Sequence, residues 1–115
     1  MPDDAELGKH AFHILLALSG GDLHGSGIVR VVLEQSDGAL RLWPATLYGT
    51  LEQLAAEGLI RELEGDERPE GKSERRRYYR VTSSGRAALA AEAGRLASLA
   101  ELALGRVSGN AGEVP

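Results

Sequence analysis

The stretch PATLYGTLEQLAAEGLIREL, residues 44–63, carries the pattern that decides the fold. Its first part places apolar side chains at helical spacing, which predicts one buried stripe: Leu47, Leu51, Leu54 and Ala55. Pro44 suits the first turn of such a helix, because its missing N–H removes no hydrogen bond there, and Gly58 is a typical terminator. Residues 59–63 have strand character, so a helix followed directly by a strand is expected.

Two further helices are predicted upstream of this stretch. Residues 7–19 repeat apolar side chains at helical spacing and stop at the turn formers Gly20 and Gly21. Residues 24–36 form the second predicted helix, and glycines in its first turns, Gly25 and Gly27, weaken it. We therefore expect this helix to be held by close packing against a neighbouring element.

A β-hairpin with a long loop is predicted after the third helix. Residues 59–63 and 76–81 have strand character, and residues 64–74 between them are polar and rich in turn formers. Side chains alternate between the two faces of a strand, so the arginines at its start cannot all point the same way. Tyr79 and Val81 are expected to face the core.

The last predicted element is a long helix over residues 82–107, capped by the hydroxyl of Thr82 or Ser83. Four of its residues fall at heptad-like spacing: Leu89, Leu96, Leu99 and Ala103. They could pack on their own domain, but one helix of this length cannot bury both sides against so small a core. A dimerisation seam is therefore favoured, and residues 108–115 are expected to be a disordered tail.

The order of elements predicts a mainly α fold with a small β-hairpin wing. Residues 7–82 would form a winged helix-turn-helix domain and residues 83–107 a C-terminal dimerisation helix. The polar face of the third helix fits the major groove of DNA, and the hairpin brings basic side chains to the adjacent backbone. Pairing of two copies would place two recognition helices on successive turns of DNA, about 34 Å apart.

Charge is distributed unevenly along the chain. The net charge is −4, but residues 72–80 hold five basic groups and one acidic group, so this segment is +4 and the rest is −8. A concentrated basic patch on an acidic body is enough to engage phosphates locally.

Several classes of protein are disfavoured. The absence of cysteine excludes disulfides, thiolate metal sites and a cysteine nucleophile. No stretch is as long as a membrane span, and the acidic N-terminus lacks the basic start of a signal peptide, which favours a cytoplasmic protein. His10 and His13 lie one turn apart without a third ligand, and His24 is expected to be structural, so no metal is expected. Phosphate-binding and nucleophile motifs are missing, so neither an enzyme nor a cofactor is expected.

Three segments together resemble the PadR family of winged helix-turn-helix regulators, in its small type with a single C-terminal helix. They are LHGSGI (23–28), PATLY (44–48) continuing to EGLI (57–60), and RRRYYRVT (75–82) with Gly85 and Leu89 beyond it. The resemblance covers about residues 7–104. It implies transcriptional control, usually repression, relieved by a small molecule or another signal. The family takes its name from a repressor that responds to phenolic acids.

Candidate DNA-contacting residues lie on the third helix and the wing. On the helix they are Thr46, Tyr48, Gly49 and Gln53. On the wing they are Lys72, Arg75, Arg76 and Arg77. Tyr48 could instead pack between helices, and the wing cations could be a solvated surface. Trp43 is expected in the core at the start of the third helix, with an effector pocket as the alternative.

The favoured function is that of a homodimeric, sequence-specific regulator of transcription. Its partners would be double-stranded operator DNA, a second copy of the chain and a small-molecule effector of unknown identity, and the expected action is repression. The alternative is a winged-helix module that binds protein, which the acidic net charge motivates. Salt discriminates the two, because DNA binding through several phosphates weakens steeply as salt rises. A metal-sensing repressor is a third option, which the absent cysteines and few histidines disfavour.

Overall fold

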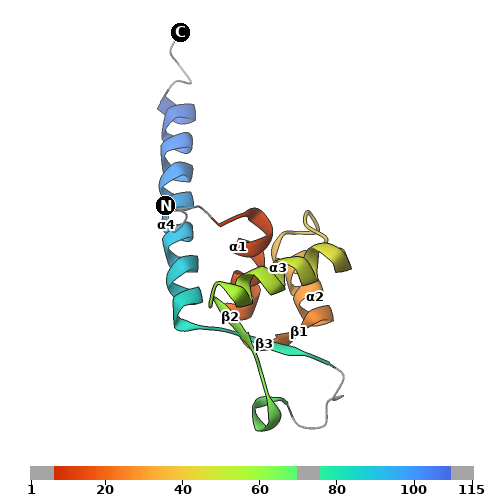
Figure 1. Cartoon of the computed structure of the whole chain (residues 1–115). Coiled ribbons are helices and arrows are strands. Elements are labelled where there is room, and N and C mark those ends of the chain that lie inside the picture. Colours follow the sequence, from red (N-terminus) through yellow and green to blue (C-terminus); the bar gives the residue numbers. More distant parts are fainter. Residues whose placement is uncertain (1–6, 70–75, 110–115) are drawn as a thin grey trace.

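Helix α1 (Lys9–Ser19) is central to the domain in the computed structural model, which describes residues 7–69 and 76–109 (Figure 1). Its innermost apolar side chains are fully buried, with Ile14, Leu15 and Leu18 at most 1% exposed. The predicted helix is confirmed, although it begins at Lys9 rather than at residue 7.

Strand β1 (Leu23–His24) and helix α2 (Gly25–Gln35) follow directly. The strand was not predicted, because two residues are too few to show an alternating pattern. His24 ends the strand and caps the helix, since its Nδ1 accepts a hydrogen bond from the Gly27 N–H at 3.4 Å. Its expected structural role is thereby confirmed.

The segment between α2 and α3 (Pro44–Ala56) is extended at its end, and its side chains alternate between core and solvent. Leu42 is 3% exposed, whereas Trp43 is 64% exposed. The prediction that Trp43 lies in the core is therefore wrong. Because Leu42 points inward, the next side chain, Trp43, points outward. There the Cζ atom of Arg41 lies 5.6 Å from the centroid of the indole ring.

A three-stranded antiparallel sheet closes one side of the helices, in the order β1-β3-β2. Strands β2 (Ile60–Glu62) and β3 (Tyr78–Val81) form the wing hairpin and are shorter than predicted. Tyr79 and Val81 are buried as predicted. The loop begins with a short 3₁₀ helix, η2 (Gly65–Glu67), which the sequence did not reveal.

The core is formed where the three short helices meet the sheet. Its largest fully buried side chains come from α1, α2, α3 and β2: Ile14, Leu15, Leu18, Ile28, Val32, Leu54 and Ile60. This arrangement is mainly helical with a small sheet, and it confirms the predicted winged helix-turn-helix class.

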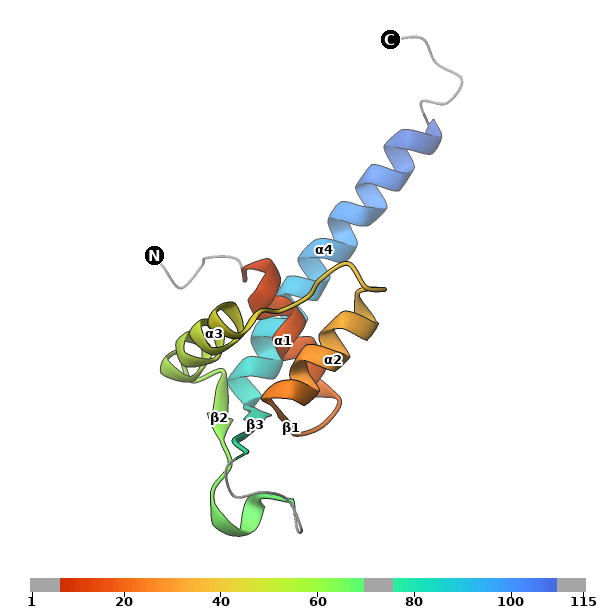
Figure 2. The ribbon, with the colours of Figure 1, turned by 90° about the vertical axis from the view of Figure 1, so that its right-hand side faces the viewer.

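Helix α4 (Ser83–Gly109) starts on the domain and then leaves it. Thr82 caps the helix, because its Oγ1 accepts the Gly85 N–H at 3.0 Å. Glycine is required at position 85 so that α4 can pack closely on the backbone at Leu59, since a Cβ there would lie 2.1 Å from the Leu59 carbonyl oxygen. Figures 1 and 2 show the distal half projecting away from the other helices. α4 ends two residues beyond the predicted Val107, and the tail from residue 110 lies outside the described residues. Among those residues, no helix has both the length and the apolar character that a membrane crossing requires.

Candidate nucleic-acid interface

Helix α3 buries one stripe and leaves its other faces open. Leu47, Leu51 and Leu54 are 1–2% exposed and fix the helix to the core. The four residues predicted to contact DNA are all exposed on the remaining surface: Thr46, Tyr48, Gly49 and Gln53. The structure therefore brings these candidates to one accessible helix surface.

Tyr48 both contacts the neighbouring helix and reaches solvent. Its side chain is about half exposed, at 49%. Its hydroxyl lies over Gly25, the first residue of α2, and a Cβ at Gly25 would be only 2.5 Å from that oxygen. The close packing predicted for the glycines of α2 is thus present at Gly25, and it holds the Tyr48 side chain beside the wing.

A groove of about 340 Å³ separates α3 from the wing. The helix contributes Tyr48, Leu51, Glu52 and Ala55, and the hairpin contributes Glu62, Arg77 and Tyr79. The lining of this α3–wing groove combines apolar and aromatic side chains with three charged ones, Glu52, Glu62 and Arg77. Burial raises the pKa of the Tyr79 hydroxyl, because it disfavours the charged phenolate.

Arg77 and Arg76 point to opposite faces of the hairpin, as strand alternation predicts. Arg77 lines the α3–wing groove, and its Nε and Nη2 donate to Glu62 Oε1 at 3.2 and 3.0 Å. The hydrogen bond to Glu62 raises the pKa of Arg77. Arg76 extends toward β1, where its Nη1 lies 3.3 Å from His24 Nε2. The other two wing candidates, Lys72 and Arg75, lie outside the described residues.

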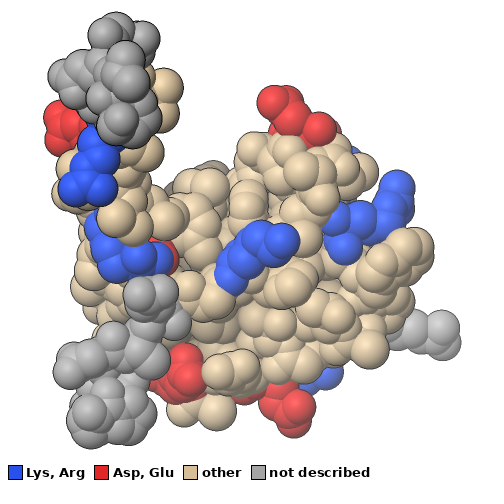
Figure 3. All heavy atoms as spheres, turned by 90° about the horizontal axis from the view of Figure 1, so that it is seen from above, with Lys and Arg blue, Asp and Glu red and all other residues tan. Residues whose placement is uncertain are grey.

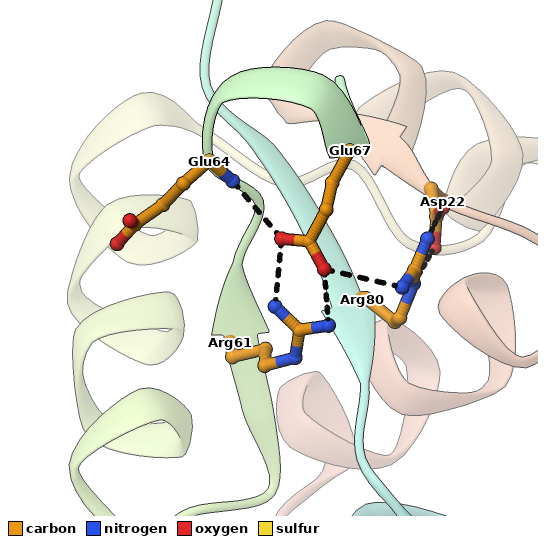
Figure 4. Close-up of polar contacts among 5 residues, drawn as sticks. All are labelled: Asp22, Arg61, Glu64, Glu67 and Arg80. Carbon is orange, nitrogen blue, oxygen red and sulfur yellow. Dashed lines mark hydrogen bonds and ion pairs between the residues drawn. The ribbon is translucent and has the colours of Figure 1, made fainter. Parts of the chain in front are cut away.

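An ionic network lies at the base of the wing, and Figure 4 shows Glu67 at its centre. Arg61 donates to both Glu67 oxygens at 2.9 and 2.6 Å, and Arg80 Nη1 lies 3.6 Å from Glu67 Oε2. Arg80 also donates twice to Asp22, at 3.0 and 2.8 Å. We call these four residues the wing-base network. The hydrogen bond from Arg61 and a second from the Glu64 N–H lower the pKa of Glu67 to about 2.

The histidines of α1 do not assemble a metal site. His13 contacts α2, where Gln35 Nε2 donates to the His13 carbonyl at 2.8 Å. Within residues 7–69 and 76–109, no three potential ligands gather where a metal could bind. His13 is partly buried, and this burial, together with the nearby Lys9 and His10, lowers its pKa.

The four residues predicted for the dimer seam divide into two groups. Leu89 packs against the core of its own domain. Leu96, Leu99 and Ala103 are exposed on the projecting half of α4. Figure 3 views the molecule from the side opposite the wing, and wide uncharged areas separate its scattered charged side chains.

Residues 14–91 match the profile of the PadR-like family of transcriptional regulators. The match covers more than half of the chain. The chain belongs to this family.

A curated relative agrees with the assignment of this PadR-like regulator. The transcriptional regulator Rv3488 of Mycobacterium tuberculosis is 39% identical over 100 residues, which are 87% of each protein. The family is one of transcriptional regulators, which confirms the prediction that this PadR-like chain is not an enzyme.

Solved structures share the fold of this PadR-like regulator. A PadR family transcription regulator from Clostridium difficile has a TM-score of 0.68 at 22% identity, covering 83% of this chain and 94% of that one. Bacillus subtilis PadR in complex with operator DNA has a TM-score of 0.57 at 25% identity, covering 70% of this chain and 44% of that one.

Sequence reasoning missed several residues in and around the candidate interface. Glu52 and Glu62 line the α3–wing groove, and the wing-base network was not foreseen. Asp22 and Arg80 are 58 residues apart, so no local pattern joins them. A usable signal was present nearby, because Glu64 and Glu67 have the spacing of a capping box, which predicts a helical turn in the loop.

Proposed function

We propose that this PadR-like regulator binds operator DNA as a homodimer, with α3 in the major groove and the wing on the adjacent backbone. The observation that carries the proposal is the α3–wing groove, where Tyr48 and Arg77 face a common space from two elements. A hydroxyl and a guanidinium that face one groove can both donate to a phosphate, and Arg77 would exchange its exposed pairing with Glu62 for that contact. Operator DNA in the complex of Bacillus subtilis PadR supports the same use of the fold.

Helix geometry supports the role of α3. Apart from the ring of Tyr48, its outward surface carries polar or small side chains, so it can approach base edges closely. Gly49 and Gln53 lie on this surface beside Thr46. The N-terminal residues of a recognition helix commonly contact bases, which favours Thr46 for that role.

A second copy of the chain is the proposed partner of α4. Residues 96–109 are all exposed, and they include five large apolar side chains: Leu96, Leu99, Leu102, Leu104 and Val107. A helix that offers this much apolar surface is stabilised by burying it against another helix. The proposed seam uses Leu96, Leu99 and Ala103, with Leu89 at its inner end where α4 meets the domain.

Repression is the proposed consequence of binding, because a dimer seated on a promoter excludes other proteins from the same DNA.

A small molecule that binds one dimer geometry better than another would shift operator affinity and relieve repression. The effector is of unknown identity, so a panel of small molecules of different chemical classes is the probe. Addition of such a compound should release a fluorescent promoter fragment from the protein. Loss of the gene should raise transcription from the bound promoter.

The proposal is tested by fluorescence anisotropy with the upstream promoter DNA at several salt concentrations, with random-sequence DNA as competitor. Arg77→Ala should weaken binding to specific and random DNA alike, and it should reduce the slope of log Kd against log salt by about 1. Arg106→Ala is the matched control, because it removes the same charge from the last turn of α4, far from the groove (Figure 2). Binding by the wild-type chain that ignores salt would contradict DNA recognition and favour a protein-binding module instead.

A further inference from the structure

The wing-base network links η2, which lies outside the sheet, to strands β2 and β3 and to the turn before β1. Asp22 precedes β1, Arg61 belongs to β2, Glu67 ends η2 and Arg80 belongs to β3. Glu67 receives two hydrogen bonds from Arg61 and one from the Glu64 N–H at 3.2 Å. A capping box between Glu64 and Glu67 closes η2 on itself, so the turn and its anchoring carboxylate form one unit.

A direct connection runs from η2 to the segment just before β3, which carries the wing cations Arg76 and Arg77. Arg68 is the C-cap residue of η2, and its Nη2 donates to the carbonyl oxygen of Arg76. Fixing η2 therefore fixes the backbone at Arg76 and at Arg77 beside it. The hairpin strands contain only three and four residues, so the sheet alone offers few bonds to set the direction of the loop.

Exposure argues against a large role of the network in global stability. The side chains of Arg61, Glu67 and Arg80 are 47%, 36% and 40% exposed, and ion pairs in such positions add little to folding. Paired, double-donor contacts do restrict geometry, because the guanidinium and carboxylate planes must align. The hydrogen bonds from Arg61 and the Glu64 N–H lower the pKa of Glu67 to about 2, because both stabilise the charged carboxylate.

We propose that Glu67 is a positioning residue for the wing: it uses Arg61 and Arg80 as structural anchors and thereby sets where Arg76 and Arg77 meet DNA. Arg61 and Arg80 are basic and partly exposed, but both already bind carboxylates in the free protein. Each of the two donates to both oxygens of one carboxylate, whereas Arg77 contacts a single oxygen of Glu62 and is 63% exposed. Arg61 and Arg80 are therefore assigned to orientation and Arg77 to phosphate contact. This inference rests on the proposed function, because wing direction affects binding only if the wing contacts DNA.

Two variants that change charge equally separate positioning from simple electrostatics. Glu67→Gln and Asp66→Asn each remove one negative charge from η2, and Asp66 makes no ion pair among the described residues. Electrostatics alone predicts that both variants bind DNA as tightly as the wild type or more tightly. Positioning predicts that Glu67→Gln binds about tenfold more weakly, the loss of one charged hydrogen bond. Its slope of log Kd against log salt should also fall by about 1, while Asp66→Asn keeps the wild-type slope.

Measurements on the free protein keep the inference separable from the proposed function. Amide resonances of η2, Arg76 and Arg77 should shift or broaden in Glu67→Gln and stay in place in Asp66→Asn, with core resonances unchanged in both. If the wild type binds no DNA, the proposed function fails, and these resonances still decide whether Glu67 orders the wing. Unchanged wing resonances in Glu67→Gln, or tighter DNA binding equal to that of Asp66→Asn, would overturn the positioning role.

Discussion

Helices α3 and α4 each carry a stripe of apolar side chains, but only the stripe of α3 is buried within the chain. In α3, the stripe of Leu47, Leu51 and Leu54 is 1–2% exposed, so its partner surface lies within the same domain. In α4, Leu96 and Leu99 are 39% and 49% exposed, and every residue from 96 to 109 is accessible. The α3 stripe supports the fold of one chain, whereas the α4 stripe lacks a partner within residues 7–69 and 76–109.

The largest effect on stability is expected in the buried stripe of α3. Leu54→Ala should lower the free energy of unfolding by about 2–5 kcal/mol, because it removes transfer energy and leaves a cavity in a packed core. Urea unfolding followed by circular dichroism measures the change. Gln53→Ala is the control, since it alters the neighbouring exposed position, and its effect should stay within about 0.5 kcal/mol. Equal losses in the two variants would mean that the stripe is not buried as described.

A smaller effect, which depends on protein concentration, is expected in the exposed stripe of α4, where a substitution should weaken dimerisation. Leu99 is half exposed in one chain, so a second copy can bury only the remaining half, worth roughly 1 kcal/mol for each copy. Leu99→Ala should therefore raise the dimer dissociation constant about 30-fold, which corresponds to about 2 kcal/mol. Analytical ultracentrifugation over a dilution series measures it.

Glu101→Ala provides the control for the seam, because it changes an exposed charged residue of the same helix half. Its dissociation constant should remain close to that of the wild type. If Leu99→Ala and the wild type dissociate at the same concentration, α4 does not form the seam through this face, and the contrast between the two helices loses its proposed meaning.

The same contrast explains what the sequence revealed. All four helices were predicted, because each repeats its apolar residues over at least eleven positions and the signal is local. Strand β1 was missed because it has two residues and forms only when Leu23 pairs with Tyr79, 56 positions later. The exposed face of α3 followed from its stripe, so Thr46, Tyr48, Gly49 and Gln53 were placed on the surface correctly. Ala55 was wrongly included in the buried stripe, because it is exposed at the edge of that face.

Contacts between distant segments could not be predicted in the same way. The packing of Tyr48 on Gly25 depends on how α2 crosses α3, and no single-helix pattern contains that information. The wing-base network likewise needs the folded sheet to bring Arg80 beside Asp22. Leu89 shares heptad-like spacing with Leu96 yet packs on its own domain, because α4 leaves the core only after Leu89.

Substitution of Trp43 should have the smallest effect on the free energy of unfolding. The residue also tests whether a second copy covers the start of α3. Since its side chain is 64% exposed, Trp43→Phe should change the free energy of unfolding by less than about 0.5 kcal/mol. As the only tryptophan, it reports its own environment: its emission should be red-shifted and readily quenched by acrylamide. Comparing the tryptophan emission of the wild type with that of Leu99→Ala at one concentration separates burial within one chain from burial by a second copy. Blue-shifted, protected emission in both would mean that Trp43 is in the core after all. Protection in the wild type alone would mean that a second copy covers Trp43, and the dimer contact would then extend from α4 to the start of α3.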